Sequence, residues 1–250
     1  MSGAVAMAGG IDPLNDREFQ ALRVLIRQLT GIHLADGKRE LVSSRLRRRV
    51  QALGMSSYGQ YHDHVARGGG GPAERTALIN CITTNKTDFF REPHHFVFLR
   101  RLAAKWRQRP PAGRALRIWS AGCSTGEEPY SISIALHDLL PAGAGWDVRV
   151  LASDIDTDVL AHAREGFYRP ERLADLPRSA ERYFVRENDG LRVVPEIRER
   201  VDFRQVNLIG EWNLPERFDL VFCRNVVIYF DRETQERLFT RFARQLSPGG

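Results

Sequence analysis

Cysteine is scarce in this 250-residue sequence: there are three, and no two of them form a CxxC pair. A small, odd number of scattered cysteines argues against a disulfide framework and against a cysteine zinc site. No apolar run is long enough to span a bilayer. The first residues, MSGAVAMAGGIDP, lack the basic leader and apolar core of a signal peptide. We therefore expect a protein of the reducing cytoplasm that does not insert into a membrane.

Acidic residues are the minority charge. Lysine and arginine number 37 against 31 aspartates and glutamates, which gives a formal net charge of +6. An excess of this sign suggests an acidic partner, either nucleic acid, anionic lipid or an acidic protein, although arginine-rich composition alone gives the same total. The 42% hydrophobic and 27% charged content is typical of a globular protein with a sizeable core.

The first part of the chain has helical periodicity. Asp12 and Pro13 fit an N-cap followed by a first-turn proline, and Gly31 fits a helix end. The apolar stripe between them has spacings of three and four, at Phe19, Leu22, Ile26 and Leu29. Asp36 is a candidate cap for a second helix, and the run GGGGP at 68–72 precedes another. We predict an all-helical N-terminal domain over residues 13–83.

The remainder, residues 84–250, alternates between strands and helices. Apolar runs predict strands at Leu116–Ala121, Val148–Ser153, Val201–Val206 and Phe218–Cys223. Helical patterns fall at Phe96–Arg107, Tyr130–Leu140, Thr157–Glu165 and Arg232–Leu246. This alternation predicts a parallel sheet buried on both faces, an α/β fold. The closing LSPGG is a turn that we expect to lead into a further strand.

An arginine-rich insertion interrupts the alternation between residues 166 and 200. Within it, RYFVRENDGLRVV reads as two short strands around Asp189-Gly190, which is a hairpin signal. We therefore expect a small β-hairpin subdomain on the larger sheet.

The loop after the first strand, GCSTGEEP, differs from a phosphate-binding loop. Gly122 and Gly126 permit close backbone approach, but Glu127 and Glu128 follow where a pyrophosphate would bind. Two carboxylates repel a phosphate and favour a ligand that carries positive charge. S-adenosylmethionine, with an adenosine, a sulfonium and an ammonium group, fits. The alternative is that the glutamates only favour the first turn of a helix.

Two further strand ends are polar. Asp154 in LASDID is placed to accept ribose hydroxyls, or else caps the next helix, a role that Asp156 fills equally well. The fourth strand ends at Cys223, Arg224 and Asn225, of which the asparagine alternatively is a turn residue. Since the carboxyl ends of parallel strands meet at one edge, we expect these groups to line one crevice.

Taken together, several motifs resemble one family. These are TTNKTDFFREPHHF, WSAGCSTGEEPYSI, SDIDTDVL, FRQVNL and FDLVFCRNVVIYFD. The sequence resembles the bacterial chemotaxis methyltransferases of the CheR type. The resemblance implies a Rossmann-like S-adenosylmethionine-dependent methyltransferase sheet with a helical N-terminal domain and a small β-subdomain. It also implies transfer of a methyl group to glutamate side chains of chemoreceptors, with S-adenosylhomocysteine as the product.

The resemblance also assigns residues. It implies catalytic roles for Arg91 and Tyr229, at the methyl-transfer centre. The implied cofactor-binding set is Asn85, Thr87, Arg91, Glu128, Asp154, Asn207, Leu208, Cys223, Arg224 and Asn225. Between Glu127 and Glu128, and among Cys223, Arg224 and Asn225, the choice stays open.

No general base is needed, because a substrate glutamate is already ionised at neutral pH. Arg91 is expected to orient that carboxylate, or else to bind the carboxylate of the cofactor. Tyr229 is expected to donate a hydrogen bond or to line the methyl channel. His94 and His95 are adjacent on a helix, so we expect their side chains to point in different directions, one packed and one facing solvent, and to share no metal. Cys123 is expected to be a small loop residue and not a nucleophile.

The helix within DGKRELVSSRLRRRVQALG is strongly basic. The resemblance implies that Arg45, Arg48 and Arg49 bind the acidic receptor helix, whereas such runs are usually solvated surfaces. The hairpin implies docking of a receptor tail, although its tip is short. We expect a monomer that acts on cytoplasmic helices of methyl-accepting chemoreceptors and not on nucleic acid.

Two rival functions remain. A nucleic-acid methyltransferase would need aromatic side chains among the basic ones, and none lies between Lys38 and Leu53. A non-catalytic module that binds cofactor and receptor would bind the donor without turnover.

Overall fold

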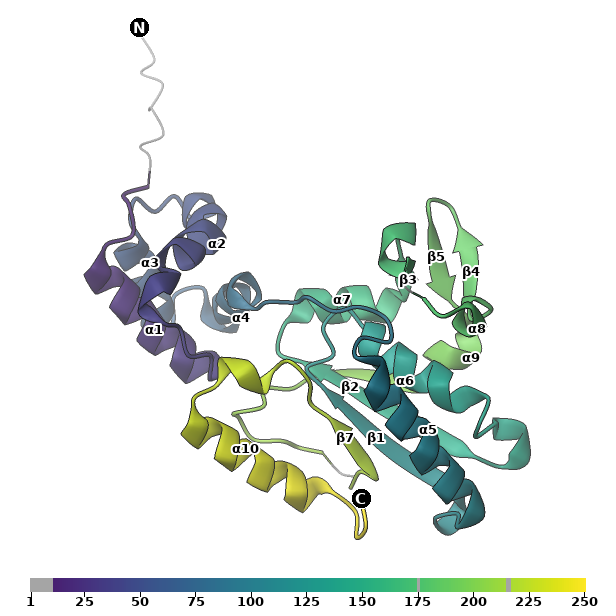
Figure 1. The fold of residues 1–250 in the computed structure, drawn as a ribbon. Helices are drawn as coiled ribbons and strands as arrows, with labels where there is room; N and C mark the ends of the chain where they lie inside the picture. The colour runs from purple at the N-terminus through teal and green to yellow at the C-terminus, as the bar shows by residue number, and fades with distance from the viewer. Residues whose placement is uncertain (1–10, 175, 215–216) are drawn as a thin grey trace, which may run out of the picture. The chain divides into compact units, whose positions relative to one another are not determined.

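The computed structural model describes residues 11–174, 176–214 and 217–250 (Figure 1). The chain divides into two compact units. One extends to Thr83 and includes Tyr229–Asp231, and the other comprises Thr84–Ile228 and Arg232–Gly250. Among the described helices, none combines the length and apolar content needed to cross a membrane.

The first unit is helical. Its helices are α1 (Asp16–Thr30), α2 (Arg39–Ala52), α3 (Tyr58–Ala66) and α4 (Gly71–Ile82), with a 3-10 turn η1 at Asp36–Lys38. The predicted stripe of α1 is buried at Phe19, Leu22 and Ile26, while Leu29 packs at its margin. These side chains share one core with residues of the other three helices, so the short helices are stabilised mainly by packing.

Two predicted helix caps were wrong. Asn15 caps α1, because its side chain accepts the Glu18 N–H at 3.0 Å while Glu18 accepts the Asn15 N–H at 3.2 Å. Asp12 instead donates its N–H to the carbonyl of Ser56. Asp36 opens η1, and α2 begins at Arg39. Gly31 ends α1 in the left-handed conformation as predicted, with φ of 77°.

The second unit contains the predicted parallel sheet, which confirms the α/β fold. The strand order is β6 (Val201–Gln205), β2 (Asp147–Asp154), β1 (Ala115–Ala121) and β7 (Leu220–Phe222). Every pairing in it is parallel. The carboxyl ends of all four strands therefore lie at one edge.

Helices cover both faces of this sheet. On one face, α5 (Pro93–Gln108), α6 (Glu127–His137) and α7 (Thr157–Glu165) pack against residues such as Ile118 and Val150. On the other face lies α10 (Arg232–Gln245), whose Phe242 meets Trp119 edge-on at 5.2 Å (Figure 1). Short 3-10 turns η2 (Ala112–Arg114), η3 (Ala142–Ala144) and η5 (Val227–Tyr229) join the elements.

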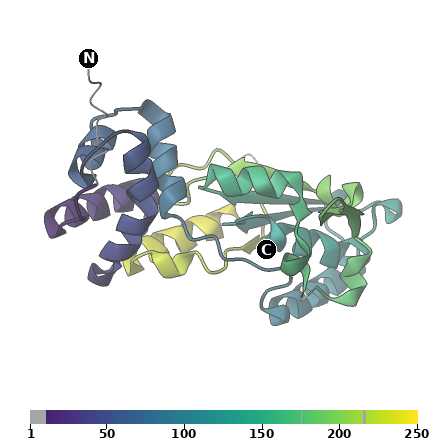
Figure 2. The same cartoon turned by 90° about the horizontal axis from the view of Figure 1, so that it is seen from above.

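The insertion forms a small antiparallel sheet with one strand more than the sequence predicted. The expected hairpin is β4 (Phe184–Glu187) and β5 (Gly190–Val193), and β3 (Phe167–Tyr168) pairs with β5. Two residues are too few to show a period, which is why β3 was not predicted. The turn η4 (Pro170–Leu173) and the short helices α8 (Arg178–Glu181) and α9 (Pro195–Arg198) complete it. In the turned view of Figure 2, α7 leads into this green segment.

Candidate active site

The loop between β1 and α6 is tightly packed. Gly122 has φ of 88°, and a Cβ there would lie 2.2 Å from Cγ2 of Val226. Gly126 has φ of 98°, and its Cβ would lie 2.8 Å from the Tyr168 hydroxyl and 2.9 Å from Ala163. Both positions therefore require glycine, because any side chain there would clash and the positive φ disfavours other residues.

The two glutamates of this loop have different surroundings. Glu127 is fully buried, and its carboxylate accepts hydrogen bonds from Arg172 and from the Thr125 hydroxyl. Glu128 accepts a hydrogen bond from Ser120 at 2.7 Å, and its other oxygen lies 3.4 Å from the Arg224 guanidinium. Because Glu127 is fully enclosed whereas the Glu128 side chain is 12% exposed, the geometry favours Glu128 as the ligand-facing carboxylate.

The second strand end separates the roles of its two aspartates. Asp156 caps α7 by accepting the N–H groups of Asp158 and Val159. Asp154 is left at the end of β2, where it accepts the N–H groups of Ser124 at 2.8 Å and Asp156 at 3.0 Å. Asp154 thus links β2 to the glycine loop and does not cap the helix. Its carboxylate has lone pairs beyond these two bonds.

Burial shifts the pKa of both candidate carboxylates in the same direction. It raises the pKa of Glu128, against the hydrogen bond from Ser120 and the charge of Arg224. It also raises the pKa of Asp154, against the N–H groups of Asp156 and Ser124. Each acid therefore gains from a ligand that brings positive charge or hydroxyl donors to it.

The segment before α5 packs against the glycine loop and the end of β2. The Asn85 amide donates to Asp156 at 2.7 Å, and the Asn85 carbonyl accepts from Ser124 at 2.9 Å. Thr87 is buried, and its carbonyl accepts a hydrogen bond from Arg172. Arg91 donates to the carbonyl of Lys86 at 3.0 Å. The structure therefore brings these predicted residues next to the loop, and among the described residues the Arg91 side chain donates only to Lys86.

At the end of β7, Arg224 joins two acids. Its side chain is 10% exposed and lies 3.6 Å from Glu92 and 3.4 Å from Glu128, and it donates to the carbonyl of Arg91. Asn225 has φ of 57° and donates to Glu92 at 3.4 Å. Arg224 is thus engaged by protein groups, which favours a positioning role for it over a direct cofactor contact.

The thiols beside this crevice are poor nucleophiles. Burial raises the pKa of Cys123 far above its usual value, and burial followed by the charge of Glu128 raises the pKa of Cys223 to about 12. Both therefore stay protonated at neutral pH.

The segment after β6 holds Asn207 and Leu208. The Asn207 side chain accepts the N–H of Ile209 at 3.1 Å, so it folds its own turn. Leu208 is buried, and its carbonyl accepts from Arg241 at 2.8 Å.

The remaining predicted residues lie in the helical unit. Tyr229 is half-buried there and its carbonyl accepts the His33 N–H at 2.7 Å. On α2, Arg49 pairs with the buried Glu74, and Arg45 donates to the carbonyls of Ile82 and Thr83. Both arginines thus bind α4 to α2, whereas Arg48 is exposed.

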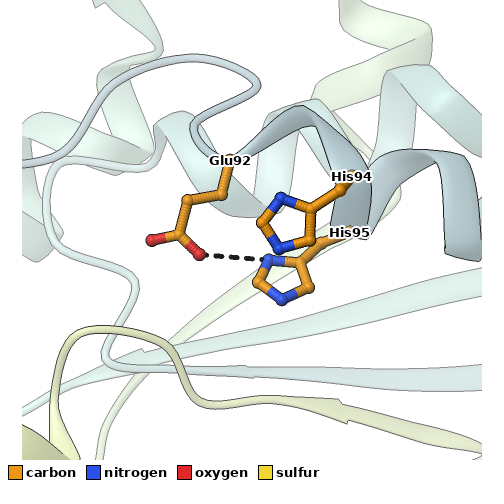
Figure 3. A group of neighbouring side chains, drawn as sticks. All are labelled: Glu92, His94 and His95. Atoms are coloured by element: carbon orange, nitrogen blue, oxygen red, sulfur yellow. Dashed lines mark ion pairs between the residues drawn. The ribbon is translucent and has the colours of Figure 1, made fainter.

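His94 is exposed and His95 is half-buried, as expected, but the expectation that their side chains diverge was wrong. Their ring centroids lie 4.1 Å apart, and Glu92 lies 3.3 Å from Nδ1 of His95 (Figure 3). Both histidines lie in the first turn of α5, directly after Glu92 in the left-handed conformation. Burial and then the charge of Arg224 lower the pKa of His95. Although burial opposes it, Arg224 followed by Asn225 keeps the pKa of Glu92 below its usual value.

The sequence did not predict the residues whose side chains position the candidate site residues. Ser120 donates to Glu128, and Arg172 donates to Glu127. The Tyr168 hydroxyl donates to the Thr125 carbonyl at 2.7 Å. Arg172 and Tyr168 come from the insertion, more than forty residues along the chain. No local pattern announces such pairs.

Two family models and several known proteins match most of this chain. A family model described as the SAM binding domain of CheR methyltransferase matches residues 85–250, and one described as its all-alpha domain matches residues 17–83. The chain is 46% identical over 241 residues to chemotaxis protein methyltransferase 2 of Pseudomonas aeruginosa, covering 93% of this chain and 83% of the relative. It is 48% identical over 246 residues to the chemotaxis protein methyltransferase of Klebsiella aerogenes, with 95% and 81% covered. The Escherichia coli protein of that name is 45% identical over 244 residues, with 95% and 82% covered.

Proposed function

The chain belongs to the CheR methyltransferase family, and from that premise we propose that it methylates glutamate carboxylates of chemoreceptors with S-adenosylmethionine. One observation carries the proposal at the level of chemistry. Two largely buried acids, Asp154 at the end of β2 and Glu128 in the first turn of α6 after β1, lie at the edge of the sheet where a nucleotide phosphate would otherwise be held. The site therefore suits a cationic adenosine ligand.

The residues present fit this cofactor. The glycine loop leaves no room for a side chain at Gly122 or Gly126, so its conformation is fixed by packing against Val226, Tyr168 and Ala163. Glu128 would hold a cationic group, and Asp154 would accept ribose hydroxyls. When bound, S-adenosylmethionine supplies an electrophilic methyl group.

The chain's own residues have to position the acceptor. A glutamate substrate is ionised at neutral pH, so no residue has to remove a proton. Arg91 would orient the carboxylate by a bidentate contact, which also favours its ionised form. Holding two reactants in attack geometry can lower a barrier by roughly 7–11 kcal/mol. Tyr229 would donate a hydrogen bond to the acceptor or border the methyl path.

The acceptor helix would be recognised by charge. Arg45 and Arg49 hold α4, so Arg48 is the predicted α2 arginine whose side chain is exposed toward a partner. Attraction between an acidic helix and this surface would raise the association rate and weaken with salt.

The test has two parts. Incubation with S-adenosylmethionine and an acidic receptor helix should give base-labile methyl esters, and Arg91→Met should abolish them while S-adenosylhomocysteine still binds. Calorimetry with S-adenosylhomocysteine should show binding by the wild type and a loss of at least about tenfold in Asp154→Ala, roughly 1.4 kcal/mol. Methyl groups on nucleic acid, or binding without turnover, would refute the proposal.

A further inference from the structure

The first turn of α5 gathers three metal-ligating side chains that methyl transfer does not use. Glu92, His94 and His95 each offer one ligand atom, and these atoms all lie within 4.8 Å of one another. Figure 3 shows the carboxylate directed at the pair of imidazole rings. We propose that this His–His–Glu cluster is a binding site for a zinc ion.

The distances suit a small ion. Zinc binds histidine nitrogen at about 2.0–2.1 Å and carboxylate oxygen at about 2.0–2.2 Å, so tetrahedral donors lie roughly 3.3–3.5 Å apart. Glu92 Oε2 and His95 Nδ1 are already 3.3 Å apart. The rings, with centroids 4.1 Å apart, lie side by side. Small side-chain rotations would therefore bring all three donors around one ion.

One ring nitrogen of the cluster is buried without a hydrogen bond, and it lies where the ion would bind. Nδ1 of His95 is buried and makes no hydrogen bond, and it faces the carboxylate of Glu92. A buried polar atom without a partner is costly unless a water or an ion satisfies it. Zinc placed between these two groups would satisfy both. His94 is exposed, so the cluster is open to solvent on that side.

The surrounding charges and the donor types of the cluster limit which metal it can bind. Arg224 lies 3.6 Å from Glu92, and the cluster sits at the positive end of a helix. Both oppose any cation. Magnesium and calcium prefer all-oxygen sites, often with several carboxylates, and the cluster has a single one. Zinc accepts two imidazoles and one carboxylate, so this set can hold it. We expect modest affinity for that reason.

Zinc would also act on the cofactor site, a consequence that rests on the proposed function. Arg224 contacts Glu92, Glu128 and the Arg91 carbonyl. Zinc on Glu92 removes one of the acidic partners of Arg224 and leaves its charge to Glu128. Glu128 is then less available to a cationic ligand. Linkage requires the reverse effect of equal size, so cofactor should weaken zinc binding.

The experiment uses the full chain without a polyhistidine tag, stripped of metal by a chelator. Zinc is titrated against a chromogenic zinc chelator, and cobalt is added in parallel to read the ligand field. We expect one ion per chain and a tetrahedral cobalt spectrum. His94→Ala and Glu92→Gln should each weaken zinc binding about tenfold or more. His94 is exposed, so its variant should keep the wild-type circular dichroism spectrum.

The matched control is His62→Gln. His62 also lies beside a carboxylate, 3.0 Å from Asp63, but belongs to the helical unit. Its variant should bind zinc like the wild type. Unchanged binding in His94→Ala, loss in the control, or a cobalt–thiolate band from cysteine would each overturn the site.

The proposed function fails separately. Zinc binding that depends on His94 would stand even if no receptor were methylated. If the site is correct and coupled, zinc should weaken S-adenosylmethionine binding in the wild type and not in His94→Ala. Equal weakening in both proteins would overturn the coupling.

Discussion

Replacing Glu74 by glutamine should destabilise the helical unit without touching the methyl-transfer centre. The Glu74 side chain is 3% exposed and receives Arg49 through both of its oxygens. The hydroxyl of Tyr61 adds a third hydrogen bond at 2.9 Å. The substitution keeps the shape of the side chain but removes the charge that all three donors address.

The expected magnitude follows from this geometry. Breaking a fully buried ion pair costs about 3–5 kcal/mol, but the Arg49 side chain is 36% exposed and solvent screens the pair. Hydrogen bonds to a charged group are each worth about 1.5–3 kcal/mol. A loss of about 2–3 kcal/mol is therefore expected, which lowers the melting temperature of a unit this small by about 10–20 °C.

Hydrogen exchange on the full chain measures this loss in the amides of α2 and α4. The same experiment separates two readings of the basic helix, with Arg49→Met and Arg48→Met as the matched pair. Arg49→Met should lose stability, because it leaves Glu74 buried without its charge partner. Arg48→Met should change stability by less than about 0.5 kcal/mol and instead weaken methylation of a receptor helix, most strongly at low salt.

Equal stability effects of the two arginine variants would refute this reasoning. So would a Glu74→Gln variant whose α2 and α4 amides exchange like those of the wild type.

Three further predictions concern titration and packing. Glu128→Gln should weaken S-adenosylmethionine binding about tenfold, as measured by calorimetry. The affinity of the wild type should fall with decreasing pH already above pH 4.5. The reason is that burial raises the pKa of Glu128 and only the ionised carboxylate attracts the cation. Gly122→Ala should abolish cofactor binding, since its Cβ would lie 2.2 Å from Val226 and its φ is 88°; adding Val226→Ala should restore it in part, and no rescue would point to backbone strain alone. The hydrogen bond from Arg49 lowers the pKa of Glu74 below 4.5, so its stabilisation is complete above pH 4.5 and lost as pH falls through the lowered pKa; acid titration followed by circular dichroism should show a flatter profile in Glu74→Gln.

Patterns with a period were predictable from the sequence. The apolar runs gave all four strands of the parallel sheet within two residues, and α7 begins and ends where the pattern placed it. Helix starts were harder, because a cap is a reciprocal side-chain contact. Asn15 and Glu18 have the spacing of a capping box, a signal that the prediction at Asp12-Pro13 overlooked.

The site was predictable only in part. The parallel topology places Asp154, at the end of β2, and Glu128, in the helix that follows β1, at one edge of the sheet. The choice between Glu127 and Glu128 depends on Arg172, a contact across 45 residues that no local pattern contains. Likewise, the geometry of His94 and His95 depends on the left-handed backbone of Glu92, which breaks the ideal helical directions assumed for neighbours.

The small sheet cannot be treated as a removable cassette. Tyr168 reaches the glycine loop through the Thr125 carbonyl, and Arg172 anchors both Glu127 and the carbonyl of Thr87. A chimera that takes this insertion from a relative must therefore have a tyrosine and an arginine at the positions of Tyr168 and Arg172. Without them, the glycine loop between β1 and α6 would lose the contacts that fix its conformation. Whatever selection acts on the outer edge of the small sheet, these two side chains remain constrained by their contacts with the glycine loop and Glu127.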